Sequence, residues 1–559
     1  MTWRYKIGLS FFLVLFSLIT ARLFYWQVVR ADELSSMGSA QYGRRVIQSA
    51  ARGEIRTSDD YPVVTNKLSY LLFVNPKEIE SASDIADMLS PILEIESASI
   101  SAKIIPDRFW VPVYDGLDIE KKERIEKLNL KGVGFEKQTT RFYPEASMSA
   151  KLFGFVGKDN DGVDKGYFGL EGFYDRQLRG KGGETIIIND AQGRPILSKL
   201  DRNTGGVDGR SLVLHTDRVI QFMLDNTLKA GVKKFGAEAG MAAIMDPTTG
   251  AMIAMSSFPS FDPTNYEKYS DKLYRDPLIS DTYEPGSTFK PLVMAAALDA
   301  GVVEASTKCP ICAGPIPIGE YNIRTWNNEY RANATMNDVI VHSDNTGMVY
   351  VGRSLGLDRM ISYLDKFGIG TLTGIDLQGE VVPNVREKND WYPIDLATSS
   401  FGQGIIVTPI ELLTAFSAVA NGGKRMEPQV VSKIITPGNE TIEIQPKVLD
   451  QPISDRAAKI ITEMMVNAVD EGEAKFAKPD GYRIAGKTGT AQIPVAGRYD
   501  PNQTIASFIG FAPADDPKFL MLVIIDRPKS SIYGAETAAP IFFDVATKML
   551  NYYGIPPSE

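Results

Sequence analysis

Histidine and cysteine are scarce in this chain, with two residues of each among 559. The zinc-peptidase motif HExxH needs two histidines four residues apart, and His215 and His342 do not provide that spacing. Two cysteines without further partners do not complete a structural metal site either. The sequence therefore predicts no metal centre and no cofactor.

An excess of basic residues is missing as well. Lysine and arginine together number 60 against 69 acidic residues, so the formal net charge is −9 and the pI is about 5.2. A nucleic-acid-binding protein presents a basic face to the phosphates, so we expect no nucleic acid among the partners. Apolar residues at 44% and charged residues at 23% are ordinary for a folded protein.

Charge is also missing from one long segment near the N-terminus. The run IGLSFFLVLFSLITA has no charged residue, and after Arg22 the apolar sequence resumes, so that residues 7–29 are long enough to span a bilayer. A cleaved signal peptide needs small residues after its apolar run, but the aromatic residues 24–26 stand there. Such residues are typical of a membrane interface, so we expect an uncleaved transmembrane helix.

Basic residues mark the inner end of this segment. Arg4 and Lys6 precede it, and cytoplasmic flanks are enriched in such residues. The pattern predicts a cytoplasmic N-terminus at residues 1–6 and an extracytoplasmic chain from residue 30 onward.

The rest of the chain changes character near residue 211. Residues 31–49 have few apolar anchors and predict a stalk. After it we expect a buried strand at LSYLLFVNP, a capped helix at SASDIADMLSPIL and a charged helix at IEKKERIEKLN. Glycines are frequent from 154 to 209, which indicates a loop-rich, extended segment. These observations predict one domain at 30–210 and a second at 211–559.

The second domain begins and ends with strands. SLVLHTD predicts a strand, RVIQFMLDNTLKAGVKK an amphipathic helix, and GMAAIMDPTTGAMIAMSS a hairpin that turns at DPTTG. Near its end YRIAGKTGTAQI, TIASFIGFAP and KFLMLVIIDRP predict three more strands, and AAPIFFDVATKMLNYY predicts a closing helix. We expect all these strands to meet in one antiparallel sheet with helices packed against it.

The first chemical motif is YEPGSTFK. Ser287 heads the apolar helix STFKPLVMAAALDAG, which ends at Gly301, and Lys290 follows on the same helical face. A neutral lysine amine in reach of a serine can take its proton, and a helix N-terminus adds partial positive charge. Taken alone, however, the pair is better explained as a serine helix cap beside a surface lysine.

Two further motifs carry short polar side chains. VHSDNTG lies between a helical segment and an apolar run, and AGKTGTAQ lies in a predicted strand. Alone, the first is a turn and the second is a strand with a glycine. Their polar and glycine residues are Ser343, Asp344 and Asn345, and then Lys487, Thr488, Gly489 and Thr490.

Together the three motifs are far more specific. Ser343 follows Ser287 by 56 residues, and Lys487 follows Ser343 by 144. The ordered set SxxK, SDN and KTG is typical of penicillin-binding proteins and class A β-lactamases. The chain resembles a class B penicillin-binding protein, a D,D-transpeptidase of the bacterial cell wall.

The resemblance extends over nearly the whole chain. ARGEI, RFYPEASMSAKLFGFVG and GLEGFYD resemble the N-terminal pedestal of the family. MDPTTGAMIAMSSFPSFDPTNY, SSFGQGIIVTPIELLTAFSAVANGG and ASFIGFAPADDPKF resemble its transpeptidase domain, and YGAETAAPIFFDVATKML resembles the division-specific branch. This implies an α+β multidomain fold, in which a transmembrane helix and a dimerisation-type pedestal precede a transpeptidase domain like that of serine β-lactamases.

The resemblance also implies the reaction and the partners. The substrates are stem peptides of peptidoglycan, which are cross-linked in septal wall synthesis, and β-lactams are inhibitors. The location is a bacterial cell membrane, with a membrane-embedded glycosyltransferase and other wall-synthesis proteins as partners.

Each motif side chain acquires a role from the resemblance. Ser287 attacks the carbonyl of a terminal D-Ala–D-Ala unit, and Lys290 takes its proton. Ser343 passes a proton to the leaving amine, with Lys487 behind it. Asn345 holds both the lysine amine and the substrate amide.

The third motif supplies contacts to the substrate. The backbone N–H groups of Ser287 and Thr490 form the oxyanion hole, and Thr488 and Thr490 bind the terminal carboxylate. Gly489 allows another backbone to lie close to the strand. Alternation puts the two threonines on one face and Lys487 with Gly489 on the other. We therefore expect this strand to run along the edge of the cleft, where the substrate can add to it as a further strand.

Some features depart from the family or leave alternatives open. Thr57, Ser58 and Asp60 stand where the family has an Asp-Arg pair and a glycine after RGxI, which puts the packing of the stalk in question. Glu284 precedes the motif serine, and we expect it to have a structural or electrostatic role. The two cysteines of KCPICAG, at 309 and 312, form either a tight disulfide or free thiols.

Two other functions remain open from the sequence. One is a catalytically weak, penicillin-binding scaffold or sensor, although its motifs would be expected to degrade. The other is a D,D-carboxypeptidase or β-lactamase, in which water replaces the acceptor amine, although the large pedestal argues against a small hydrolase.

Overall fold

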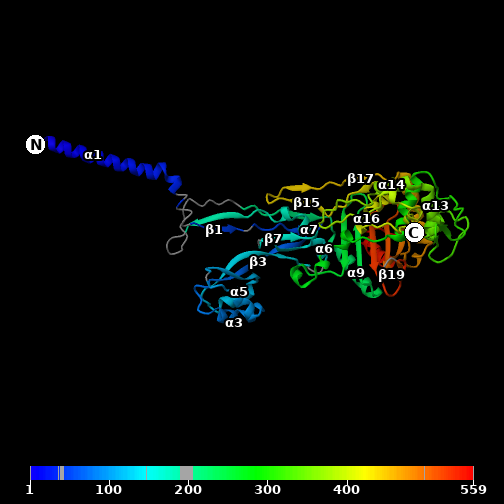
Figure 1. The fold of residues 1–559 in the computed structure, drawn as a ribbon, viewed down its shortest axis with the longest axis horizontal. Coiled ribbons are helices and arrows are strands. Elements are labelled where there is room, and N and C mark those ends of the chain that lie inside the picture. Colours follow the sequence, from blue (N-terminus) through cyan, green and yellow to red (C-terminus); the bar gives the residue numbers. More distant parts are fainter. Residues whose placement is uncertain are drawn as a thin grey trace. The chain divides into compact units, whose positions relative to one another are not determined.

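The computed structural model describes residues 2–34, 37, 43–48, 50–106, 108–145, 148–160, 162–188, 206–495 and 498–557 (Figure 1). The chain forms two compact units. One contains residues 1–51 and 180–209, and the other contains residues 52–179 and 210–559.

The smaller unit consists of a long helix and a strand pair. Helix α1 (Thr2–Phe24) continues into the π-helical turn η1 (Tyr25–Val29), and β1 (Gly43–Gln48) pairs antiparallel with β8 (Gly183–Ile188). No side chain of Thr2–Val29, all of which the structure describes, is buried, and the mean hydropathy reaches 2.1. At 1.5 Å per residue this helix exceeds the roughly 30 Å of a hydrocarbon core. The predicted helix is confirmed, while most of the predicted stalk at 31–49 lies outside the described residues.

The larger unit contains the pedestal segments, which are built around a seven-stranded sheet. The strand order is β16-β15-β9-β2-β3-β4, with β5 paired to β3. The bounds are β2 (Ile55–Arg56), β3 (Pro62–Val74), β4 (Val111–Leu117), β5 (Val133–Phe142), β9 (Ser211–Leu214), β15 (Val431–Ile435) and β16 (Thr441–Glu443).

Three short helices cover apolar side chains of this sheet. They are α3 (Ala82–Leu93), α4 (Ser97–Lys103) and α5 (Ile119–Glu126), and they share a core with β3 and β4. The predicted strand LSYLLFVNP lies largely in β3, and the two predicted helices are α3 and α5. The Ser81 hydroxyl accepts a hydrogen bond from the Asp84 N–H at 3.3 Å, so the predicted cap of α3 is confirmed.

The three pedestal motifs of the sequence converge on one buried carboxylate. Glu171, from GLEGFYD, is fully buried. It accepts hydrogen bonds from Arg52 Nε of ARGEI at 2.7 Å and from Arg141 Nε of RFYPEAS at 2.6 Å. Arg52 also binds Asp175 at 2.9 Å. Removing one partner of such a buried pair costs about 3–5 kcal/mol, so this network holds distant segments together.

The unusual TSDD sequence forms the turn between β2 and β3. Asp60 adopts a left-handed backbone with φ of 64°, a conformation that aspartate tolerates better than most residues. The Thr57 N–H donates to the Tyr61 carbonyl at 2.9 Å, which closes the turn. The sequence departure is therefore accommodated locally.

The second sheet of this unit is antiparallel and five-stranded. Its order is β11-β10-β20-β19-β18, which makes β18 an edge strand. The bounds are β10 (Ala239–Met245), β11 (Met252–Phe258), β18 (Ala485–Val495), β19 (Arg498–Ala512) and β20 (Phe519–Asp526). The predicted hairpin at DPTTG is β10–β11, and the three predicted C-terminal strands are β18, β19 and β20.

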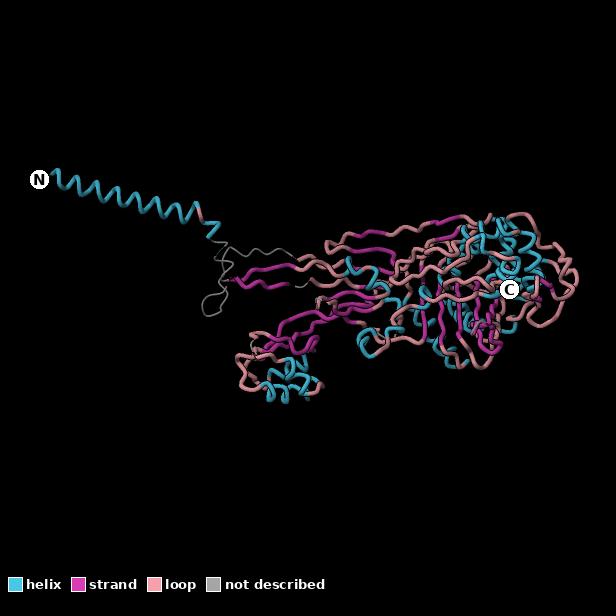
Figure 2. The backbone as a smooth tube through the Cα atoms, viewed as in Figure 1, coloured by secondary structure: helices cyan, strands magenta, loops and turns pink. Residues whose placement is uncertain are grey.

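Helices pack against both faces of this sheet (Figure 2). On one face α9 (Arg218–Phe235) and α18 (Ala538–Tyr552) share a core with Ala242, Phe508 and Val523. On the other face α11 (Lys290–Asp299), α16 (Pro409–Ala420) and α17 (Asp455–Asp470) share a core with Ala243, Ile509 and Leu522. Adjacent residues thus face opposite helical layers, as strand alternation requires.

The pairing partner predicted for one strand was wrong. SLVLHTD forms β9, but β9 does not join the five-stranded sheet. It pairs antiparallel with β15 and parallel with the pedestal strand β2, so one sheet contains residues from both sides of position 210. A four-residue apolar strand has no sequence feature that selects its neighbour, which is why the prediction failed.

Candidate active site

Ser287 lies in a tight turn and not at a helix cap. The 3₁₀ turn η4 (Gly286–Phe289) contains the serine, and α11 starts only at Lys290. Gly286 has a φ of 57°, which favours glycine. Within the described residues, neither η4 nor α11 has a side-chain cap hydrogen bond. The cap interpretation of Ser287 is therefore wrong.

Two neighbouring segments brace this turn. The Gly286 N–H donates to the Gly402 carbonyl at 2.9 Å, which ties η4 to the SSFGQG loop. A Cβ on Gly402 would lie 2.0 Å from the Gly286 carbonyl oxygen, so only glycine fits there. On the other side, a Cβ on Gly489 would lie 2.8 Å from the Thr288 methyl group and 2.4 Å from the Ser507 hydroxyl. The expected close approach at Gly489 is thus confirmed, and it brings β18 against η4.

Lys290 is completely buried and points to the second motif. Its Nζ donates to the Ser343 carbonyl at 2.6 Å and to Asn345 Oδ1 at 2.8 Å, and it lies 3.1 Å from Ser343 Oγ. Two of these partners are carbonyl oxygens, which only accept hydrogen bonds. A neutral amine has two hydrogens for these two acceptors, so its lone pair remains free to accept from a hydroxyl.

The surroundings favour that neutral form. Burial is the largest cause that lowers the pKa of Lys290 well below its usual value, and the like charge of Lys487 lowers it further. Asp344 and Glu473 oppose the shift without cancelling it. Burial also lowers the pKa of Lys487, against the opposing effect of Glu473.

The SDN motif forms the turn between two helices. Helix α12 (Met336–Val341) ends just before it and α13 (Asn345–Leu355) starts within it. Ser343 has a left-handed backbone with φ of 56°, which turns its carbonyl and hydroxyl toward Lys290. Asp344 caps α13, because its Oδ1 accepts from the Thr346 N–H at 2.8 Å and the Gly347 N–H at 3.2 Å. The aspartate of the motif is therefore occupied in positioning the turn.

The KTG motif lies on β18, at the edge of its sheet, as expected. Lys487 Nζ donates to the carbonyl and hydroxyl oxygens of Thr488 at 3.2 and 3.1 Å. The Thr490 hydroxyl accepts from the Gly534 N–H at 3.1 Å. Among the described residues no further strand pairs with β18 beyond β19, and Thr488 and Thr490 line the cleft on this edge strand.

The three motifs meet at one cleft of about 320 Å³. Ser287, Ser343, Asn345, Thr488 and Thr490 line it, while Lys290 and Lys487 are buried behind it. The lining residues that motif reasoning did not single out are Gly286, Arg324, Trp326, Phe401, Gln403, Glu473, Gln492, Thr504, Ile532 and Tyr533.

Glu473 is the most informative of these unexpected residues. It accepts a hydrogen bond from the Thr488 hydroxyl at 3.4 Å, and its negative charge acts to raise the pKa of both buried lysines. It lies in the loop after α17, in EGEAKF, where it looks like any surface carboxylate. Phe401 and Gln403 had a usable signal, because they belong to the glycine-rich SSFGQG segment.

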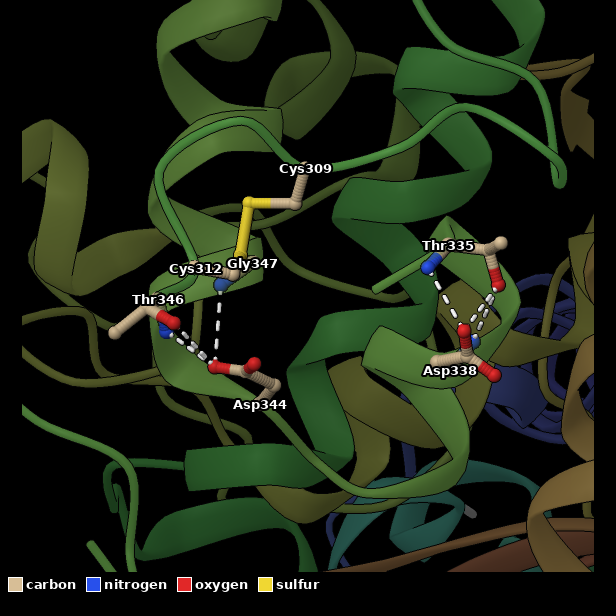
Figure 3. Close-up of a disulfide and its surroundings, with 7 residues drawn as sticks. All are labelled: Cys309, Cys312, Thr335, Asp338, Asp344, Thr346 and Gly347. Atoms are coloured by element: carbon tan, nitrogen blue, oxygen red, sulfur yellow. Dashed lines mark hydrogen bonds between the residues drawn. A yellow bond between two sulfur atoms is a disulfide. The ribbon is translucent and has the colours of Figure 1, made fainter. Parts of the chain in front are cut away.

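Cys309 and Cys312 form a disulfide, which resolves the alternative that the sequence left open (Figure 3). The Cys309 N–H donates to the Ala334 carbonyl at 2.8 Å, next to the start of α12. There Thr335 and Asp338 form a reciprocal capping box (Figure 3). The disulfide thus braces the helix that leads to Ser343, and neither cysteine lines the cleft.

Glu284 is turned away from the cleft. Its Oε1 accepts from the Gly404 N–H and from the Tyr499 hydroxyl, both at 3.1 Å. Burial raises its pKa. Among the described residues, no cluster of three histidine, cysteine or carboxylate side chains has the arrangement of a metal site.

Comparisons with known proteins cover both regions of the chain. The family described as the penicillin-binding protein transpeptidase domain matches residues 240–547, and the penicillin-binding protein dimerisation domain matches residues 47–214. Stage V sporulation protein D of Bacillus subtilis is 33% identical over 99% of this chain and 86% of its own length. Peptidoglycan D,D-transpeptidase FtsI of Escherichia coli is 28% identical over 100% of this chain and 93% of its own length.

Solved structures agree on the fold. Penicillin-binding protein 2X from Streptococcus thermophilus superposes with a TM-score of 0.74 at 24% identity, over 92% of this chain and 81% of that one. Penicillin-binding protein 3 from Mycobacterium tuberculosis, in its apo form, superposes with a TM-score of 0.71 at 24% identity, over 92% of this chain and 98% of that one.

Proposed function

The chain belongs to the penicillin-binding proteins that combine a dimerisation domain with a transpeptidase domain, and from this premise we propose that it is a peptidoglycan D,D-transpeptidase that works through an acyl-serine intermediate. One observation carries the chemical part of the proposal. A fully buried lysine amine is held by Ser343 and Asn345, one helical turn from a serine that lines the cleft. This is the arrangement of an activated nucleophile with its base.

The first half-reaction acylates the serine. Ser287 Oγ attacks the carbonyl carbon of the penultimate D-alanine while its proton passes to Lys290. The N–H groups of Ser287 and Thr490 stabilise the resulting oxyanion. When the C–N bond breaks, the leaving D-alanine amine receives a proton through Ser343, with Lys487 behind it.

The second half-reaction forms the cross-link. The amine of a second stem peptide attacks the ester carbonyl, loses a proton to the base, and releases Ser287 with its proton restored. Before acylation, Thr488 and Thr490 hold the terminal carboxylate of the donor, which departs with the released D-alanine. The donor backbone pairs with the edge strand β18 in both half-reactions. A β-lactam inhibits because it acylates the same serine.

The location and partners follow from the anchor and the resemblance. The apolar helix Thr2–Val29 fits a membrane anchor. Arg4 and Lys6 precede its apolar run, so the N-terminus is cytoplasmic and the cleft is outside. We assign the cross-linking to septal wall synthesis beside a membrane-embedded glycosyltransferase. A reporter that is active only outside the cytoplasm, fused after residue 559, should be active, and silence there would refute this topology.

Labelled penicillin tests the central claim. The full-length protein should form one covalent adduct that maps by mass spectrometry to the peptide containing Ser287, and Ser287→Ala should form none. With amine acceptors, the wild type should make cross-linked product in preference to hydrolysed product. An adduct on Ser343, or none on folded wild type, contradicts the assignment. Hydrolysis alone would point to a carboxypeptidase or β-lactamase, and acylation without turnover would point to a scaffold or sensor.

A further inference from the structure

Glu473 lies in the part of the cleft that is proposed to receive the terminal carboxylate of the donor. It lines the cleft together with Thr488 and Thr490. Among the lining residues, all of which the structure describes, Glu473 is the only carboxylate and Arg324 is the only cation. An anionic end of a substrate therefore meets a negative charge beside the two threonines that bind it.

A crowded turn fixes the position of this carboxylate. Glu473 follows Gly472 in the loop between α17 and β18. A Cβ on Gly472 would lie 2.2 Å from the Ala468 carbonyl oxygen and 2.9 Å from the Val341 carbonyl oxygen, so the loop packs tightly against α17 and the end of α12. The next residue, Ala474, is buried. Glu473 is thus presented to the cleft by a packed backbone.

The hydrogen of the Thr488 hydroxyl is already in use. A hydroxyl has one hydrogen to donate, and its oxygen can accept from other donors. Thr488 Oγ1 accepts from Lys487 Nζ at 3.1 Å, and its own hydrogen is directed to Glu473 Oε2 at 3.4 Å. An ionised carboxylate only accepts hydrogen bonds. A donor peptide that uses Thr488 must therefore take this hydrogen away from Glu473.

The neighbouring Thr490 has no such competitor. Its hydroxyl accepts from the Gly534 N–H at 3.1 Å, and it donates to no acceptor among the described residues. Its hydrogen is available to a substrate carboxylate from the start. The two threonines of the motif thus differ in readiness, and Glu473 is the reason.

A second carboxylate at Thr488 also meets electrostatic repulsion. When two carboxylates share one site, the charged form of each disfavours that of the other, and the pair takes up a proton more readily. Burial lowers the pKa of Lys487, which limits the positive charge that can offset the pair. Binding of an anionic substrate end beside Glu473 is therefore coupled to the uptake of a proton.

We propose that Glu473 competes with the terminal carboxylate of the donor for the hydrogen of Thr488 and thereby drives the released D-alanine out of the cleft. This inference rests on the proposed transpeptidase function. Before acylation, the many contacts of the whole stem peptide hold the carboxylate in place against Glu473. After acylation, D-alanine has lost its covalent link to the stem, so Glu473 recovers the hydrogen. The acyl-enzyme is then protected from the return of D-alanine and reacts with the acceptor.

The first test compares benzylpenicillin with its methyl ester on the full-length wild type in detergent. Both compounds acylate the same serine, but only benzylpenicillin carries an ionised carboxylate beside its β-lactam ring. The readout is the ratio of the two second-order acylation rates. This ratio should rise at least threefold in favour of benzylpenicillin as the pH falls from about 8 to about 5, because protonation removes the competing charge.

The ratio removes the effects that other groups have on both compounds alike. Titratable or charged groups on the elements around Glu473 are Glu471 and Lys475 in its own loop, Lys487 on β18, Lys290 on α11, His342 at the end of α12 and Arg324 in the cleft wall. A group that changes only the nucleophile or its base alters both rates equally. Lys487 can also act on the substrate carboxylate, so a variant must separate it from Glu473.

Glu473→Gln provides this separation. At about pH 8 its ratio should exceed that of the wild type at least tenfold, and the ratio should vary less than threefold over the same pH range. Glu473→Asp keeps the charge, so it should retain the pH dependence, whereas a purely structural role would make the two variants alike. Glu471→Gln, at an exposed carboxylate two residues earlier, is the matched control and should keep the wild-type ratio.

The second test measures the return of D-alanine to the acyl-enzyme. The acyl-enzyme is formed from an N-acetyl-D-alanyl thioester, and labelled D-alanine or labelled D-alaninamide is supplied as the nucleophile. The two nucleophiles differ only in the carboxylate, which the amide replaces with a neutral group. Glu473→Gln should raise the rate with D-alanine, relative to the rate with D-alaninamide, at least tenfold over the wild-type ratio.

Each result decides the inference. A wild-type penicillin ratio that is unchanged across the pH range overturns it, and so does a Glu473→Gln ratio within threefold of the wild type in either assay. If Glu473→Gln does not fold, the wild-type pH profile and Glu473→Asp decide in its place. Absence of a penicillin adduct on the wild type would instead refute the proposed function, so the two failures are distinguishable.

Discussion

Replacing Lys290 with arginine should nearly abolish acylation although it keeps the positive charge and much of the length. The structure holds the lysine fully buried, with its hydrogens directed to two carbonyl acceptors and its pKa well below the usual value. A guanidinium keeps its proton at any working pH, because its pKa lies far above that of a lysine amine. The variant therefore has a group at this position that cannot accept the proton of Ser287.

The size of the loss follows from the value of general-base catalysis. A positioned base contributes about 10²–10⁴-fold to a rate, which is about 2.7–5.5 kcal/mol of barrier. We expect Lys290→Arg to lose at least a hundredfold in the second-order rate of acylation by benzylpenicillin. Lys308→Arg, at an exposed position, is the matched control and should be unchanged.

The pH profile gives an independent reading of the same group. The pKa of Lys290 is lowered in the folded protein, so the neutral base is present above that lowered pKa and is lost as the pH falls through it. The wild-type rate should accordingly fall on the acid side with one controlling group, and Lys290→Arg should lack this limb. A folded arginine variant that retains a tenth or more of the wild-type rate would refute the reasoning and show that another group is the base.

Three further predictions concern residues around the cleft. Glu473→Gln removes the carboxylate that raises the pKa of both buried lysines. The acid limb of the pH profile of the acylation rate should therefore move to lower pH, and a shift to higher pH would contradict this electrostatic account. Replacing Cys309 and Cys312 with serine opens only a short loop, so calorimetry should show that the free energy of unfolding falls by about 2 kcal/mol. The acylation rate should stay within tenfold of the wild type, and a hundredfold loss would show that the loop takes part in catalysis. Gly489→Ala puts a Cβ 2.4 Å from the Ser507 hydroxyl, so it should cost about 1–3 kcal/mol in stability and slow acylation at least tenfold, and an unchanged rate would show that β18 can move away from the serine.

Several features were predictable from short stretches of sequence because their causes are local. The N-terminal helix follows from an uninterrupted apolar run, the cap of α3 from a serine three residues before an aspartate, and the β10–β11 hairpin from DPTTG between two apolar runs. In each case the groups that interact are within a few residues of one another.

The chemical motifs were recognisable for a different reason. Their residue types and order point to one kind of site, although Lys487 follows Lys290 by 197 residues. The sequence could not say how they would meet. The structure shows that Lys290 binds the SDN turn, that Asp344 caps α13, and that the serine lies in a 3₁₀ turn and not at a cap.

From the sequence alone follow the long apolar N-terminal helix, several of the individual helices and strands, and the motif residues that meet at the cleft. The tertiary structure decided which sheet β9 joins, that Glu473 lies beside the buried lysines, and that it accepts the hydrogen of Thr488. The physical reason is that burial, desolvation and the pairing of strands depend on segments far apart in the chain. No pattern within a few residues records which distant groups will remove a side chain from water.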